Sequence, residues 1–155
     1  MIRIKHKPRD GGAEKVTYNG IKFKSKLEMF CYKQLESSGL YFEYESKTFL
    51  LIDKFKPNIP VYKYSESTKK IEQNFVSIKH TTYTPDFIIK YKKDDNEYIV
   101  VECKGIETDN WKMKWKLLRK DIHNTNYPFI KALFVVKNQT QIKESIQLIK
   151  ELLSH

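Results

Sequence analysis

Two runs rich in Ile, Val, Phe and Tyr, at 87–92 and 97–104, have the hydrophobic pattern of β-strands. The polar segment 94–96 separates them. We therefore predict a hairpin with a three-residue loop, in which Asn96 takes the left-handed conformation.

Pairing Lys93 with Glu97 sets a register that gives this hairpin one continuous apolar face. That face pairs Phe87 with Cys103, Ile89 with Val101, and Tyr91 with Ile99. The other face pairs Asp86 with Lys104 and Ile88 with Glu102. A slip of one residue would turn the apolar side chains to the opposite face and separate Asp86 from both partners.

Periodicity elsewhere predicts three helices and further strands. A hairpin at 16–23 turns at Asn19-Gly20, 41–52 forms one or two strands, and 131–136 forms a buried strand beside the central hairpin. Ser25 caps a helix that ends before Gly39. Thr108 or Asp109 caps a helix reaching about 124, and Asn138 starts the last helix.

Segment 53–82 is the least regular part of the chain, with prolines and a polar turn at 65–70. A short hairpin ending near Ile78 fits it, and the segment reads as an insertion that contacts either substrate or a second subunit. The first fifteen residues are basic and contain glycines, which predicts a flexible arm. One domain over 16–155 suits a chain of 155 residues.

The chemistry-bearing motifs lie on the predicted central hairpin. One is Tyr83-Thr84-Pro85-Asp86-Phe87, and the other is Val100-Val101-Glu102-Cys103-Lys104-Gly105. Two carboxylates can bind a divalent metal, and a neighbouring lysine can orient water or stabilise developing charge. The alternative is a surface hairpin whose charges are solvated, but this does not explain their gathering on one face.

Pro-Asp followed by Glu-x-Lys resembles the PD-(D/E)XK nuclease superfamily, and in particular its short phage-type, Holliday junction resolvase-like members. The segment 20–28 is similar to their opening helix, and the Lys-rich segment after Gly105 is also similar. The resemblance implies an α/β (α+β) restriction-endonuclease-like core, with a central mixed sheet flanked by helices. It also implies metal-dependent DNA cleavage, possible homodimers, Asp86 and Glu102 as metal ligands, and Lys104 as the lysine.

For this reaction we expect Mg²⁺, with Mn²⁺ able to substitute, held by Asp86, Glu102 and the main-chain carbonyl of Cys103. Glu28 has two interpretations. It closes a capping box with Ser25, or it serves the site and helps to bind a second metal, as the resemblance implies. The two roles compete for the same carboxylate, and the sequence leaves both open.

The net charge of +10 and pI of about 9.4 favour a polyanionic partner, and we expect DNA. The candidate contacts are six basic residues near the motifs: Lys24, Lys26, Lys112, Lys116, Arg119 and Lys120. The alternatives are charge that serves only solubility and helix lysines that face only water.

The chain lacks a long apolar run and has a polar N-terminus, which predicts a cytoplasmic protein without membrane contact. Cys31 and Cys103 lie in apolar contexts and read as buried thiols. The predicted function is a metal-dependent DNA endonuclease, with branched DNA as a candidate substrate. The alternatives are a catalytically silent nucleic-acid-binding or assembly subunit and an RNA-directed nuclease.

Overall fold

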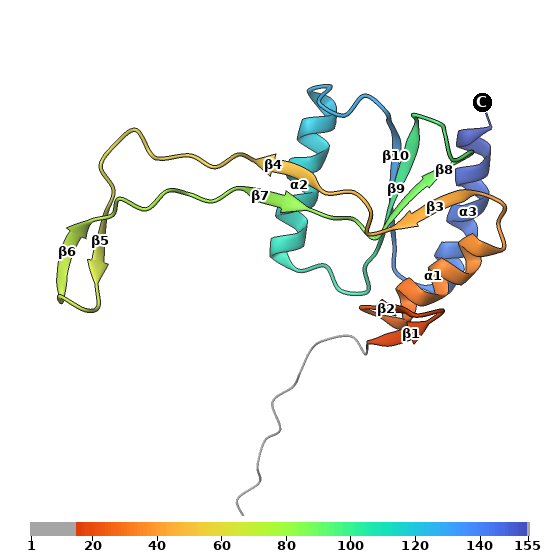
Figure 1. Cartoon of the computed structure of the whole chain (residues 1–155), viewed down its shortest axis with the longest axis horizontal. Coiled ribbons are helices and arrows are strands. Elements are labelled where there is room, and N and C mark those ends of the chain that lie inside the picture. Colours follow the sequence, from red (N-terminus) through yellow and green to blue (C-terminus); the bar gives the residue numbers. More distant parts are fainter. Residues whose placement is uncertain (1–14, 155) are drawn as a thin grey trace, which may run out of the picture.

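The computed structural model describes residues 15–154 as an α+β fold built around a four-stranded mixed sheet (Figure 1). Its helices are α1 (Lys26–Glu36), α2 (Asp109–His123) and α3 (Gln139–Leu153). Its strands are β1 (Val16–Tyr18), β2 (Ile21–Phe23), β3 (Tyr41–Tyr44), β4 (Phe49–Ile52), β5 (Tyr62–Ser65), β6 (Lys70–Gln73), β7 (Thr81–Tyr83), β8 (Phe87–Lys90), β9 (Tyr98–Cys103) and β10 (Ile130–Val136). The predicted fold class, a mixed sheet with flanking helices, is confirmed.

The central sheet has the strand order β10-β9-β8-β3. β10 runs parallel to β9, whereas the β9–β8 and β8–β3 pairs are antiparallel. All six residues of β9 are buried, because α1 and α3 cover one face of the sheet and α2 with β4 covers the other (Figure 1). A strand covered on both faces reads as a continuous apolar run, which matches this sequence.

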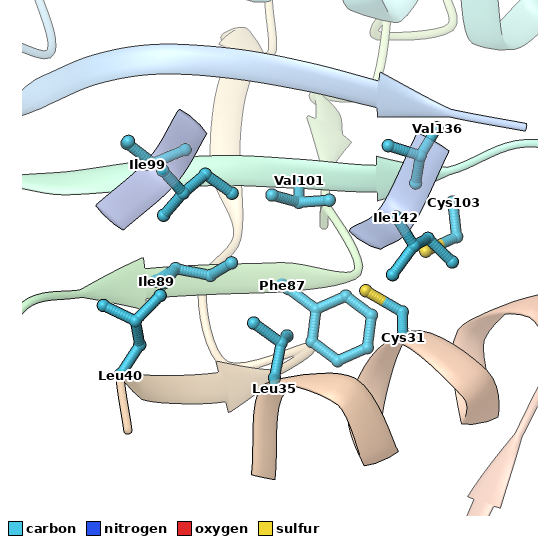
Figure 2. Close-up of a cluster of buried hydrophobic side chains, with 11 residues drawn as sticks. Cys31, Leu35, Leu40, Phe87, Ile89, Ile99, Val101, Cys103, Val136 and Ile142 are labelled. Atoms are coloured by element: carbon cyan, nitrogen blue, oxygen red, sulfur yellow. The ribbon is translucent and has the colours of Figure 1, made fainter. Parts of the chain in front are cut away.

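The first face carries a core cluster that includes Phe87, Ile89, Ile99 and Val101, packed against α1 and α3 (Figure 2). The predicted apolar face is therefore confirmed, apart from Tyr91, which lies beyond β8 and is exposed. On the opposite face, Ile88, Tyr98 and Val100 pack against both tryptophans of α2.

The predicted register of β8 and β9 is wrong by two residues. Phe87 pairs with Val101 and Ile89 with Ile99, so the strands stop earlier and the connection between them is longer than three residues. The connection turns through 92–95, where Lys92 N donates to Asp95 Oδ2 and Asp95 N donates to the Lys92 carbonyl. Asn96 is not left-handed. A two-residue shift keeps every side chain on its predicted face because strand side chains alternate.

The helix boundaries follow the predicted caps. Ser25, Thr108 and Asn138 are the N-caps of α1, α2 and α3, and each side chain accepts a hydrogen bond from a main-chain N–H of the first turn. Gly39, at φ 80°, follows the end of α1. Asn19 and Gly20 both have positive φ in the β1–β2 turn, which confirms the predicted hairpin.

Segment 53–82 runs out from the body and back to it, and so forms a long arm of two chain segments (Figure 1). β4 and β7 pair at its root, an isolated bridge joins Phe55 to Ile78, and β5 pairs with β6 as a separate ribbon at its end. The predicted basic arm at 1–15 lies, except for Lys15, outside the described residues. None of the helices described in residues 15–154 has the length and apolar character required to cross a bilayer.

Candidate active site

Three carboxylates are buried in one region of the protein. Glu28, Asp86 and Glu102 are each about 5 to 6% exposed, and no other acidic side chain is buried among residues 15–154. Asp86 lies one residue before β8, and Glu102 is the second-last residue of β9. Because Phe87 pairs with Val101, the two acids occupy the next paired position of this ladder, so Asp86 is not opposite Lys104 as the sequence had suggested.

Each acid of this pair is held by the main chain of the other strand. Cys103 N donates to Asp86 Oδ2 at 2.7 Å, and Asp86 N donates to Glu102 Oε2 at 3.3 Å. The reciprocal bonds fix both carboxylates just beyond the point where the β8–β9 pairing ends. Charge-assisted bonds of this kind are stronger than neutral ones.

Tyr83, at the end of β7, fixes Glu102 from a third side. Its hydroxyl donates to Glu102 Oε2 at 2.6 Å, in a buried setting. Burial and the charge of Glu102 raise the pKa of the Tyr83 hydroxyl, so it remains a donor. Glu102 Oε2 therefore accepts two hydrogen bonds, and Oε1 faces Lys104.

Lys104 follows β9 directly and is half-buried beside the pair. Its Nζ lies 3.8 Å from Glu102 Oε1 and 5.8 Å from the centre of the Trp111 ring on α2. Trp111 Nε1 is the one buried side-chain polar atom without a hydrogen-bond partner in the described part of the chain. The Lys104 ammonium group thus lies beside Glu102, and Trp111 adjoins the Tyr83 hydroxyl that bonds this acid.

Glu28 takes part in capping α1, but its side chain accepts from the main-chain N–H of Lys24 and not from that of the N-cap Ser25, so the predicted capping box forms only in part. Its N–H donates to Ser25 Oγ at 3.1 Å, Lys24 N donates to Glu28 Oε2 at 3.2 Å, and Ser25 Oγ lies 3.1 Å from Oε1. The Tyr44 hydroxyl also donates to Oε2, at 2.6 Å. The carboxylate of Glu28 thus accepts three hydrogen bonds, two at Oε2 and one at Oε1, which leaves one acceptor site on Oε1 open.

The site holds its negative charge at a cost. Burial raises the pKa of the Asp86 carboxyl to about 8, and the charges of Glu102 and Glu28 contribute, while the Cys103 N–H and the charge of Lys24 act in the opposite direction. Burial also raises the pKa of Glu102, although Tyr83 and Lys104 oppose the shift. Two buried carboxylates that share one partly exposed lysine resist double ionisation.

The donor set suits a hard divalent cation. Across residues 15–154 no three His, Cys, Asp or Glu side chains are placed to share one metal. Asp86 and Glu102 nevertheless offer two carboxylates, and the Cys103 carbonyl was predicted as a third oxygen. Mg²⁺ is commonly held by one or two carboxylates with water completing the shell, so the residues fit it.

The predicted DNA contacts lie on the surface, and four of them share one helix. Lys112, Lys116, Arg119 and Lys120 are exposed on α2, whose buried side packs Trp111, Trp115 and Leu118 against the sheet. Lys24 forms an ion pair with Glu45 beside the site, and Lys26 is exposed on the first turn of α1. The six basic residues therefore form two groups on different elements, one at the start of α1 and one on α2.

Sequence reasoning missed Tyr83 and Tyr44. Tyr83 stands inside the Pro-Asp motif, and its place at a strand end beside an acid was a usable signal. Tyr44 and Glu28 are 16 residues apart on different elements, and no local spacing links them.

Comparisons with known proteins give one match. No curated protein and no solved structure matches the chain. A family model described as a protein of unknown function, DUF1064, matches residues 9–142, which span the sheet, all three buried acids and the arm. The chain therefore belongs to the DUF1064 family.

Proposed function

We propose that this protein is a metal-dependent nuclease that hydrolyses phosphodiester bonds in DNA. The observation that carries the proposal is the buried pair Asp86 and Glu102, locked by reciprocal main-chain bonds with Lys104 alongside. A structural role alone does not account for two buried acids that repel each other. The resemblance to PD-(D/E)XK nucleases supports the same conclusion.

Asp86, Glu102 and the Cys103 carbonyl would hold Mg²⁺, and Mn²⁺ would substitute. When bound, the cation would lower the pKa of a coordinated water and neutralise charge on the phosphate. Its positive charge would also relieve the repulsion that raises the pKa of Asp86.

The chain's own groups supply position and charge. Lys104 Nζ, 3.8 Å from Glu102 Oε1, is placed to orient the attacking water or to stabilise charge developing on the phosphate oxygens. Tyr83 keeps Glu102 in one orientation. In the reaction, a water oxygen bonds to phosphorus and releases a proton to solvent, the bond between phosphorus and the ester oxygen breaks, and that oxygen takes up a proton from solvent.

The DNA partner and its form are part of the proposal. A net charge of +10 and the exposed basic residues of α2 suit a polyanion. Branched DNA is the first structured substrate to test, because the resemblance is to junction-cleaving members of the superfamily.

The test incubates the purified chain with plasmid, single-stranded DNA, four-way-junction DNA and RNA, each with Mg²⁺ or with EDTA. We expect Mg²⁺-dependent cleavage of DNA. Glu102→Gln should abolish it, and Glu97→Gln, an exposed acid at the other end of β9, should not. Binding without cleavage under all metal conditions would favour a silent DNA-binding subunit, and preferential RNA cleavage would favour an RNA-directed nuclease.

A further inference from the structure

The ribbon of β5 and β6 has one apolar face that nothing in the described chain covers. Tyr62 pairs with Gln73 and Tyr64 with Ile71, so these four side chains share one face. Tyr62, Tyr64 and Ile71 are 63, 46 and 65% exposed. The opposite face carries Lys63 with Glu72 and Ser65 with Lys70, and it is polar.

The rest of the arm is also apolar and exposed. More than half of the large hydrophobic side chains exposed in residues 15–154 belong to the segment 53–82. They are Phe55, Ile59, Val61, Tyr62, Tyr64, Ile71, Phe75, Val76 and Ile78. With each exposing on the order of 100 Å², the arm presents roughly 1,000 Å², whereas the largest patch on a typical monomer is about 300–600 Å².

A two-stranded hairpin alone is marginally stable in water. Here the ribbon lies at the far end of the arm, away from the helices of the body (Figure 1). Both the exposed area and the isolation of the ribbon therefore indicate that another molecule covers it.

We propose that the occupant is a second copy of this chain, with the two arms packed through their apolar faces around a twofold axis. The available area exceeds the ~800 Å² per partner of a standard protein interface. Residues 62–73 carry three lysines and two glutamates, so the ribbon is nearly neutral within a chain of charge +10. The apolar face itself carries no charge, so it neither attracts phosphates nor repels an identical face.

Twofold symmetry supplies the complement directly, since the same patch serves both partners and the assembly closes at two copies. DNA is the less suitable occupant, because the lysines of the ribbon lie on its polar face and tip. This proposal concerns the arm and does not rest on the nuclease proposal.

Sedimentation across a concentration series tests it. The wild-type chain should approach twice its mass of 18.6 kDa. The triple variant Tyr62→Ser, Tyr64→Ser, Ile71→Ser should raise the dissociation constant at least ~100-fold, because buried aromatic and aliphatic anchors carry most of an interface's affinity. The control Lys63→Ser, Glu72→Ser, on the opposite face, should remain dimeric.

Crosslinking provides a second measurement that leaves most of the patch intact. A short bis-maleimide should crosslink Ile71→Cys between copies far better than Glu72→Cys, the adjacent residue on the other face. The native cysteines are buried, so the new thiol should react first. A monomeric wild-type chain at every concentration, or equal crosslinking of both variants, overturns the proposal. A monomer whose triple variant loses DNA affinity overturns it in favour of DNA.

Discussion

Strand β9 and the ribbon of β5 and β6 both carry large apolar side chains next to charged ones, but these side chains meet opposite surroundings. In β9 every side chain is buried, including the charged Glu102. In the ribbon, large apolar side chains such as Tyr62 and Ile71 face water. Burying a charge and exposing an apolar patch are both unfavourable for an isolated folded chain.

The difference teaches that each region is incomplete in its own way. The positive charge beside the buried acids does not balance them fully, and the ribbon lacks apolar cover. A divalent cation would complete the first, and a second copy would complete the second. The chain connects the two regions through β7 at the root of the arm, whose last residue Tyr83 bonds Glu102.

The largest effect is expected when one of the two buried carboxylates of β9 and the β8 end is replaced by its uncharged amide. Asp86→Asn or Glu102→Gln should reduce Mg²⁺-dependent DNA cleavage by at least ~10³-fold, the upper range for losing one preorganised electrostatic group. Melting temperatures should not fall, because each variant removes one member of a buried carboxylate pair whose members repel each other. Cleavage rates and thermal melts measure both effects, and full activity in either variant would remove the metal-site assignment.

A matched pair of isoleucines tests the packing difference. Ile89 is fully buried in the core cluster, and Ile71 is 65% exposed. Ile89→Ala should cost about 2–5 kcal/mol of unfolding free energy. Ile71→Ala should stay within about 0.5 kcal/mol in protein dilute enough to be monomeric. Urea denaturation compares them, and similar losses would mean that the arm packs on the body in solution.

A smaller effect should distinguish the two roles of Glu28. Gln keeps an oxygen for Lys24 N and the Tyr44 hydroxyl and can still close the capping box, so stability should hold. If Glu28 serves the metal site, the variant loses a negative charge that attracts the cation, so we expect about a tenfold higher Mg²⁺ requirement for cleavage, equivalent to ~1.4 kcal/mol. A Mg²⁺ titration of Glu28→Gln with an unchanged midpoint would leave Glu28 as a helix cap only.

The raised pKa of Asp86 gives a pH dependence with a defined sign. The folded pKa, about 8, lies above the ordinary aspartate value, so protonation stabilises the folded state at low pH. Stability of the metal-free protein should fall as pH rises from about 4 to 8, with a loss of ~1 kcal/mol or more, or about 2–4 °C in melting temperature. Asp86→Asn should flatten the profile, and a profile as steep as wild type would assign the dependence to other groups.

The smallest change should fall on DNA binding alone. Each phosphate contact contributes roughly −0.9 to the log–log salt slope on duplex DNA. Lys112→Ala with Lys116→Ala should make the slope shallower by nearly two units on this count, with little change in stability. The control pair Lys92→Ala, Lys93→Ala removes the same charge from the β8–β9 connection. Equal slopes for the two double variants would mean that α2 faces away from DNA.

The sequence predicted the faces of the central hairpin better than its register. Side-chain alternation places Phe87 and Ile89 on the α1 side in either of two registers that differ by two residues. The choice between them depended on the connection, where the Asp95 carboxylate bonds Lys92 N. The polar run 94–96 suggested a tight turn, but no local rule revealed that particular bond.

Local signals also recovered the helix caps. Ser25, Thr108 and Asn138 act within one helical turn, and a linear pattern records such contacts. The Tyr44 bond to Glu28 depends on how β3 packs against α1. The exposure of the ribbon depends on its distance from the helices of the body. Both features depend on tertiary packing, which the spacing of residues along the sequence does not specify.

The two buried thiols of the core can report how often the site opens in the native protein. Cys31 on α1 and Cys103 on β9 lie against each other, and this contact together with burial raises the pKa of the Cys103 thiol (Figure 2). A thiol reagent can reach them only when helix and strand part. The rate of thiol labelling therefore reports how often β9 separates from α1. This strand carries Glu102, and its Cys103 N–H holds Asp86.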